Sequence, residues 1–180
     1  MGKKILAVLA IGIVVLGAGF AKSVIEIQVS PFSAQKIMYR NTVEYNSQYG
    51  FGGKIGYSYN YNPYLYIGAD VTYSNYKYAE KQNRYVVFGL MAKTGFILDF
   101  GGAFKTDFAL KAGIDLRHWG NSAKLYPTVG LYLGAFYSLN EKIAVTAGAD
   151  LNVAAQQNIN PVYNSVDGAL VCNTGVRVSL

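Results

Sequence analysis

Residues able to carry out catalysis or bind a metal are few in this sequence. His118 and Cys172 are the only histidine and the only cysteine among 180 residues. One residue of each type is too few for a zinc-type centre, and a lone cysteine forms no disulfide within the chain. His118 and Ser122 do not make a complete catalytic set, because no acidic partner for the histidine is evident. We therefore expect no catalytic residue, no cofactor and no metal.

Gly52-Gly53-Lys54 is the one stretch that suggests phosphate binding. The spacing of a phosphate-binding loop is absent, however, and no helix follows. Two glycines and a lysine on a β-strand explain the pattern.

Charged residues instead recur on the polar side of alternating segments. Five acids and five bases share this side, as expected if they neutralise one another in a confined interior where an unpaired charge is costly. We predict that they form a charge network in the lumen of a barrel: Glu26, Lys54, Asp70, Lys93, Lys111, Asp115, Arg117, Asp150, Asp167 and Arg177.

The elements that carry these charges are expected to be β-strands. Hydrophobic residues make up 52% of the chain, but they alternate with small or polar residues instead of forming the 20-residue runs of a membrane helix. The pattern predicts an all-β fold, an eight-stranded antiparallel up-and-down transmembrane β-barrel. The predicted strands are Val24–Ser33, Tyr49–Asn60, Tyr64–Tyr76, Tyr85–Ile97, Asp107–Arg117, Tyr126–Ser138, Ile143–Val153 and Val166–Leu180.

The connections between these strands alternate in length. Tyr61-Asn62-Pro63 and Asn140-Glu141-Lys142 are tight turns, and Leu98–Thr106 is a somewhat longer one. Between them lie the longer polar links 34–48, 77–84, 118–125 and 154–165. Short turns in the periplasm and longer loops outside are typical of outer-membrane barrels, which places both termini in the periplasm. A three-residue first turn would put Lys54 opposite Asp70, and closure would make Glu26 a neighbour of Arg177.

The N-terminal segment has the features of a signal peptide. Lys3 and Lys4 precede an apolar stretch, Ile5 to Gly17, that is too short to span a bilayer. Gly19-Phe20-Ala21 supplies small residues for cleavage. We predict a signal peptide over residues 1–21 and a barrel over 22–180.

The distribution of glycine indicates which face meets lipid. A soluble barrel of lipocalin type would turn its apolar face inward and its polar face to water. Eleven strand glycines lie on the polar face, where they weaken a strand but make room in a narrow lumen. We therefore expect the apolar face to point outward: the glycines are Gly50, Gly52, Gly56, Gly68, Gly89, Gly95, Gly113, Gly130, Gly134, Gly148 and Gly175.

Aromatic residues gather near the predicted strand ends, as in interfacial girdles. A base-stacking surface for nucleic acid is disfavoured by the signal peptide and the modest net charge of +6. The expected girdles are Tyr57, Tyr59, Tyr64, Phe104, Phe108 and Tyr137 at one end, and Tyr49, Tyr73, Tyr76, Tyr85 and Trp119 at the other.

With these features residues 24–180 resemble the small eight-stranded outer-membrane barrels of the OmpA-type, OmpX and opacity-protein superfamily. The resemblance implies a monomer in outer-membrane lipid, handled in transit by periplasmic chaperones and the barrel-assembly machinery. Such barrels usually end in Phe or Trp, whereas this chain ends in Leu180 on the lipid side. The chain also ends with the eighth strand, so no periplasmic peptidoglycan-binding domain is expected.

Three functions are compatible with such a barrel. A non-enzymatic structural or surface-interaction role, adhesion-like and with the lumen filled by charges, is favoured. A narrow, porin-like channel is the first alternative, and bilayer conductance would distinguish it. The second is a lipid A-modifying enzyme, because Arg117-His118 faintly resembles the lipid A 3-O-deacylases; that family has a serine where Gly120 stands here.

Overall fold

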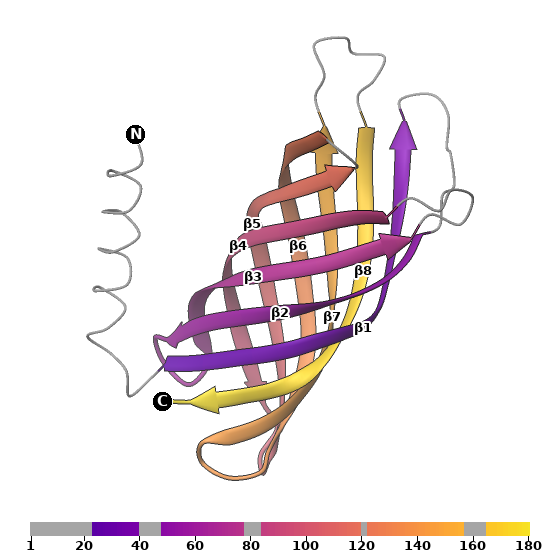
Figure 1. The fold of residues 1–180 in the computed structure, drawn as a ribbon. Coiled ribbons are helices and arrows are strands. Elements are labelled where there is room, and N and C mark those ends of the chain that lie inside the picture. Colours follow the sequence, from indigo (N-terminus) through magenta and orange to yellow (C-terminus); the bar gives the residue numbers. More distant parts are fainter. Residues whose placement is uncertain (1–22, 40–47, 78–83, 120–121, 157–164) are drawn as a thin grey trace, which may run out of the picture.

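The chain forms one closed antiparallel β-barrel in a computed structural model. The structure describes residues 23–39, 48–77, 84–119, 122–156 and 165–180. Every strand pairs with its neighbours in sequence, and β1 pairs with β8 to close the sheet (Figure 1). The strands are β1 (Ser23–Tyr39), β2 (Gln48–Asn60), β3 (Leu65–Lys77), β4 (Arg84–Asp99), β5 (Phe104–Trp119), β6 (Ser122–Ser138), β7 (Ile143–Gln156) and β8 (Ser165–Ser179).

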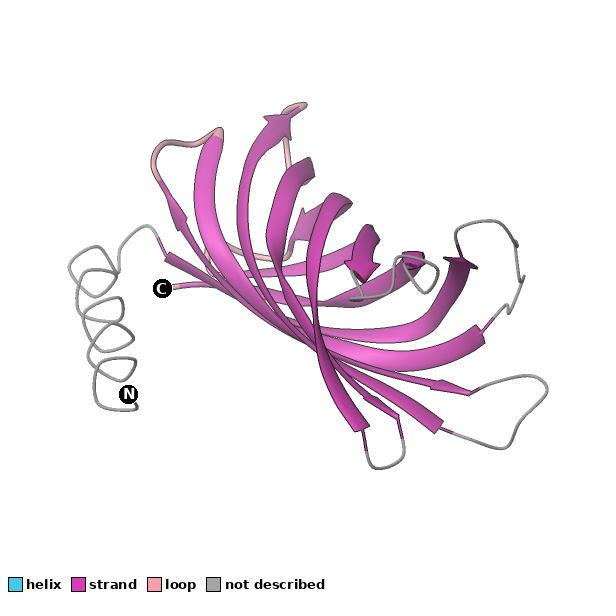
Figure 2. Cartoon of the chain, turned by 90° about the horizontal axis from the view of Figure 1, so that it is seen from above, coloured by secondary structure: helices cyan, strands magenta, loops and turns pink. Residues whose placement is uncertain are grey.

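The predicted fold class and all eight strands are confirmed. Most strands run further than predicted, chiefly at the end that carries the longer connections, here called the loop end. Seen from above, they curve as one continuous wall (Figure 2). Among the described residues, no helix has the length and apolar character needed to cross a bilayer.

Outward and inward residues alternate along the strands, with one interruption in β1. On β5, Leu110 and Ile114 are about half exposed, at 54% and 46%, whereas Ala109 and Lys111 are buried. The outward face is apolar on all strands and the inward face is mostly polar, so the lipocalin-type arrangement is excluded. The predicted assignment of faces is therefore confirmed.

β1 contains one irregularity, at Pro31 and Phe32. Its register with both neighbours shifts there, between Ser30 and Ser33 on the β2 side and between Val29 and Phe32 on the β8 side. A bulge inserts an extra residue and moves the following side chains to the other face. Ser30 and Ser33 consequently both point inward and are buried.

Three tight connections close the other end of the barrel, here called the turn end. In two of them an asparagine side chain organises the turn. Asn62 Oδ1 accepts hydrogen bonds from the backbone N–H groups of Tyr64 and Leu65, both at 2.8 Å. Asn140 Oδ1 does the same for Lys142 and Ile143, at 2.9 and 2.8 Å.

The turn between β4 and β5 uses glycine instead of asparagine. Gly101 and Gly102 have φ angles of +88° and +74°, a backbone conformation that residues with a Cβ rarely adopt. The Asp99 carboxylate accepts the Gly101 N–H at 2.9 Å. β4 and β5 therefore pair out to Asp99 and Lys105, inside the stretch predicted as a turn.

The first turn lies one residue later than predicted. Tyr61 N–H donates to Leu65 O at 2.9 Å, which makes Asn62-Pro63-Tyr64 the three-residue loop. Because the loop still has three residues, the predicted inward residues stay inward. Each residue of β2, however, pairs with a residue of β3 that lies two positions later than predicted. Lys54 therefore lies opposite Thr72, and Asp70 lies opposite Gly56.

The aromatic girdle is confirmed only in part. Tyr49 and Tyr64 are 61% exposed on the outer face, and Tyr73 packs there against Phe88 with ring centroids 5.3 Å apart. Tyr76 and Tyr85 were wrongly assigned to the girdle, because both lie at inward positions and are buried, with ring centroids 5.8 Å apart. The structure does not describe the side chain of Trp119 or residues 1–22. The place of Trp119 in the girdle and the signal peptide therefore stay predictions.

A cysteine scan of β7 tests the faces without disturbing any charged residue. Single cysteines at positions 143–147, in a Cys172→Ser background, would carry spin labels in lipid bilayers. Accessibility to apolar oxygen should peak at 143, 145 and 147, because these positions face lipid. Peaks at 144 and 146 would mean an inverted barrel, and the absence of alternation would mean that β7 is not a strand.

Candidate functional site: the lumen charge network

The lumen holds a continuous series of ion pairs, here called the ion-pair ladder. It consists of eight residues in which acids and bases alternate. Each carries a side chain that is almost fully buried, and each touches the next in the series. Its order is Asp107, Arg177, Glu26, Lys93, Asp70, Lys111, Asp150 and Lys54.

The ladder begins near the turn end, at the seam that closes the barrel. Glu26 on β1 lies directly opposite Arg177 on β8, and Arg177 Nε donates to Glu26 Oε1 at 2.7 Å. Arg177 also reaches across the lumen to Asp107 on β5, at 2.7 Å. Asp107 in turn accepts the hydroxyl hydrogen of Tyr66 at 2.5 Å.

Two lysines carry the ladder across the middle of the lumen. Lys93 contacts Glu26 at 3.0 Å and Asp70 at 2.8 Å. Lys111 contacts Asp70 and Asp150, both at 2.8 Å. Each ammonium group thus lies between two carboxylates, an arrangement that offsets part of the cost of removing these charges from water.

Lys54 ends the ladder against Asp150. The distance from Lys54 Nζ to Asp150 Oδ2 is 3.2 Å. The pairing of Lys54 with Asp70 predicted from the sequence is wrong, because the shifted first turn moves Asp70 away from it. The Asp70 carboxylate instead extends over Gly56, where a Cβ atom would lie 2.5 Å from Asp70 Oδ1.

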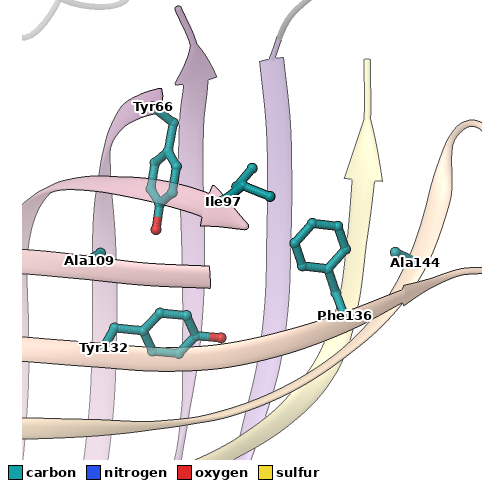
Figure 3. Close-up of a cluster of buried hydrophobic side chains, with 6 residues drawn as sticks. All are labelled: Tyr66, Ile97, Ala109, Tyr132, Phe136 and Ala144. Atoms are coloured by element: carbon teal, nitrogen blue, oxygen red, sulfur yellow. The ribbon is translucent and has the colours of Figure 1, made fainter. Parts of the chain in front are cut away.

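Aromatic rings fill the lumen between the ladder and the turn end. Tyr66, Ile97, Ala109, Tyr132, Phe136 and Ala144 form a buried cluster (Figure 3). The Arg177 guanidinium carbon lies 4.3 Å from the centroid of the Phe136 ring, and Lys54 Nζ lies 4.1 Å from that of Tyr132. Both distances are within the range of cation–π attraction.

A second group of charges, here called the upper cluster, lies toward the loop end. Arg117 is ion-paired with Asp167, and its Nη2 lies 3.6 Å from Asp115 Oδ2. Its guanidinium carbon lies 4.2 Å from the centroid of the Tyr126 ring. The upper cluster consists of Asp115, Arg117 and Asp167, and Lys124 on β6 lies directly opposite Arg117.

The ten predicted charges all point into the lumen, but sequence reasoning missed further inward charges, Asp107 and Lys124. Asp107 is 3% exposed and binds both Arg177 and Tyr66. Its odd number places it on the inward face of β5, together with Lys111 and Asp115. That parity was the available signal, although Asp107 stood at the edge of the predicted strand.

No catalytic arrangement accompanies these charges in the described part of the chain. His118 faces outward on β5, and the residues opposite it are Val86 and Ala123, neither of which could orient an imidazole. Cys172 is a free thiol on the outer side of β8. No group of three His, Cys, Asp or Glu among the described residues is placed to hold a metal ion.

The sequence matches no protein-family model, and no curated protein is found to be related to it. Solved structures do resemble the chain. Neisserial surface protein A is 19% identical, with a TM-score of 0.66 over 88% of this chain and 97% of that one. OprG from Pseudomonas aeruginosa is 11% identical, with a TM-score of 0.51 over 87% and 94%. Ail of Yersinia pestis is 10% identical, with a TM-score of 0.45 over 87% and 99%. The likeness to the first two shows that the chain has the fold of the small eight-stranded outer-membrane barrels.

Replacing Lys111 tests the ladder where two pairs meet. Lys111→Met should lower the free energy of unfolding in lipid by about 3–5 kcal/mol, because Asp70 and Asp150 both lose a buried partner. Urea titration followed by the gel shift between folded and unfolded barrel would measure it. Lys105→Met is the matched control, since Lys105 pairs with Asp99 at the surface, with side chains 31% and 36% exposed. The control should change stability by less than about 1 kcal/mol.

A double-mutant cycle would distinguish the observed partner of Lys54 from the predicted one. Coupling of Lys54 with Asp150 should exceed its coupling with Asp70. Equal losses for Lys111→Met and Lys105→Met, or the reverse order of couplings, would contradict the ladder.

Proposed function

We propose that this chain is a non-enzymatic barrel of a bacterial outer membrane that displays its longer connections at the cell surface for a structural or surface-interaction role. The fold it shares with small outer-membrane barrels supports that location. The outward face supports it too, because exposed apolar residues cover all eight strands. Residues of this kind are stable against lipid and would drive aggregation in water.

The observation that carries the proposal is the ladder itself. Its contacts cross the lumen between β1 and β4, β3 and β5, β5 and β7, β2 and β7, and β5 and β8. Eight strands enclose a space that side chains can fill, and here the buried Tyr66, Tyr132 and Phe136 occupy what the ladder leaves near the turn end. A sealed lumen leaves the outer surface and the loop end as the parts available for function.

The two alternatives have less support. A narrow channel would require the ladder to separate, at the cost of several buried ion pairs. A lipid-modifying site at His118 would require an acidic partner, which the two residues opposite His118 do not supply. We further propose that the barrel works as a monomer in outer-membrane lipid.

Solute uptake tests the sealed lumen. Liposomes containing the purified barrel should take up small sugars no faster than liposomes without protein, because the ladder and the rings leave no continuous water path. A general porin reconstituted at the same density provides the positive control. Sugar uptake clearly above the protein-free rate would favour the channel over a surface role.

Labelling of intact cells tests the orientation. Asn160→Cys lies in a longer connection and Glu141→Cys lies in a tight turn, both in a Cys172→Ser background. A maleimide that does not cross membranes should label only position 160 until the outer membrane is permeabilised, when both should react. Labelling of position 141 alone would invert the proposed orientation.

A further inference from the structure

A groove lies on the outward face of β1 to β4, which are neighbours in the barrel wall (Figure 1). Its volume is about 410 Å³. Sites for small molecules typically have volumes of about 300–1,000 Å³. Most of the outward residues around the groove are large and apolar, and they include Phe51, Gly53, Ile55, Val71, Tyr73 and Phe88.

Gly53 keeps this groove open. Most strand glycines face the lumen, where a Cβ atom would collide with a neighbouring strand, as Gly113 would with the backbone of β4. Gly53 instead faces outward, between Phe51 and Ile55. A Cβ atom there would meet only the Gln28 carbonyl oxygen, at 3.2 Å. Packing within the barrel thus gives little reason for a glycine at this position, and its missing side chain leaves a gap between larger ones.

Two aromatic rings form a fixed wall beside this gap. Tyr73 on β3 lies directly opposite Gly53, and Phe88 on β4 lies directly opposite Tyr73. The ring centroids of Tyr73 and Phe88 are 5.3 Å apart. Asn75 Nδ2 also donates a hydrogen bond to the Tyr73 hydroxyl, at 3.3 Å. A wall that is already ordered lowers the cost of binding an apolar chain against it.

The outward residues of β3 change from apolar to charged toward the loop end. Val71 and Tyr73 line the groove. Asn75 follows with a polar amide, and Lys77 ends the strand with a positive charge. Lys77 is exposed and lies directly opposite Tyr49, which is also exposed on the outer face. From Tyr73 to Lys77 the strand advances about 13 Å. A phosphorylated membrane lipid has its parts in the same order, with an apolar chain, a polar linkage and a charged head group.

We propose that this groove binds one phosphorylated lipid of the outer leaflet, with an acyl chain against Gly53 and a phosphate at Lys77. A lysine ammonium group binds phosphate as a point charge. A second copy of the barrel would fill the groove but would gain nothing from a lysine at its upper end. The choice of the outer leaflet rests on the orientation proposed above, in which the loop end faces outward.

Native mass spectrometry of the purified barrel in detergent micelles tests the site. Diphosphoryl lipid A and phosphatidylcholine are the two probes, added in equal amounts. The barrel should retain one molecule of lipid A and less phosphatidylcholine, because choline places a positive charge beside the phosphate. Binding in micelles does not depend on the orientation of the barrel in a membrane. A negative result would therefore overturn the lipid site and leave the proposed function standing.

Two changes locate the site. Gly53→Leu should reduce retention of lipid A by about tenfold or more, because the new side chain would occupy the groove. Lys77→Gln should reduce it by about threefold, since an exposed ion pair is lost. Val71→Phe, which fills the groove from an exposed position in its wall, is used if Gly53→Leu does not fold. Ala147→Leu, on the outer face of β7, and Lys105→Gln, near the turn end, are the matched controls and should retain lipid A as the wild type does.

Four results would overturn the proposal. One is that the wild-type barrel retains no lipid A. Another is equal retention by the wild type, Gly53→Leu and Val71→Phe, which would mean that the lipid binds elsewhere. The third is a dimer that Gly53→Leu converts to a monomer, which would make a second copy the occupant. The fourth is equal retention of the two probes together with an unaffected Lys77→Gln variant, which would remove the phosphate from Lys77.

Discussion

Mutual neutralisation of charges inside a narrow barrel is the constraint on which the rest of this structure depends. Lipid requires an apolar outer face, and alternation along each strand then places the remaining residues in the lumen. Eight strands leave too little room for those side chains to stay hydrated. Lys93 and Lys111 solve the problem by each joining two carboxylates. In the proposed function the same contacts also seal the lumen, so that the stability of the barrel and the expected lack of a pore would have one origin.

Period-two alternation was sufficient to predict the strands and their faces, because a bilayer on one side and a polar lumen on the other leave few exceptions. It also contained information that was overlooked. Tyr76 and Tyr85 stand at inward positions, and parity alone would have removed them from the girdle. Asp107 could have been added to the network by the same rule.

The pairing of charges could not be predicted in this way. Parity fixes the face on which a residue lies, but two strands can shift past each other by two residues without changing any face. The position of the turn decides between these registers, and Asn62 fixes that position by capping the turn. Spacing along the sequence says even less about which residues pair across the lumen. Lys111 and Asp150 are joined across β5 and β7, which are not neighbours in the sheet. Such contacts depend on barrel shape and on small residues such as Gly56 that let a side chain pass.

The placement of the ladder between distant strands has a consequence for how the protein enters the membrane. Hydrogen bonds between adjacent strands can form one hairpin at a time, but Arg177 meets Glu26 only when the last strand joins the first. Until then the lumen charges belong to an open sheet and can remain in contact with water. Their dehydration therefore falls late in assembly, in the step that completes the cylinder. An intermediate that lacks β8 would leave Glu26 without Arg177, so we expect closure of the barrel and dehydration of the lumen to occur together.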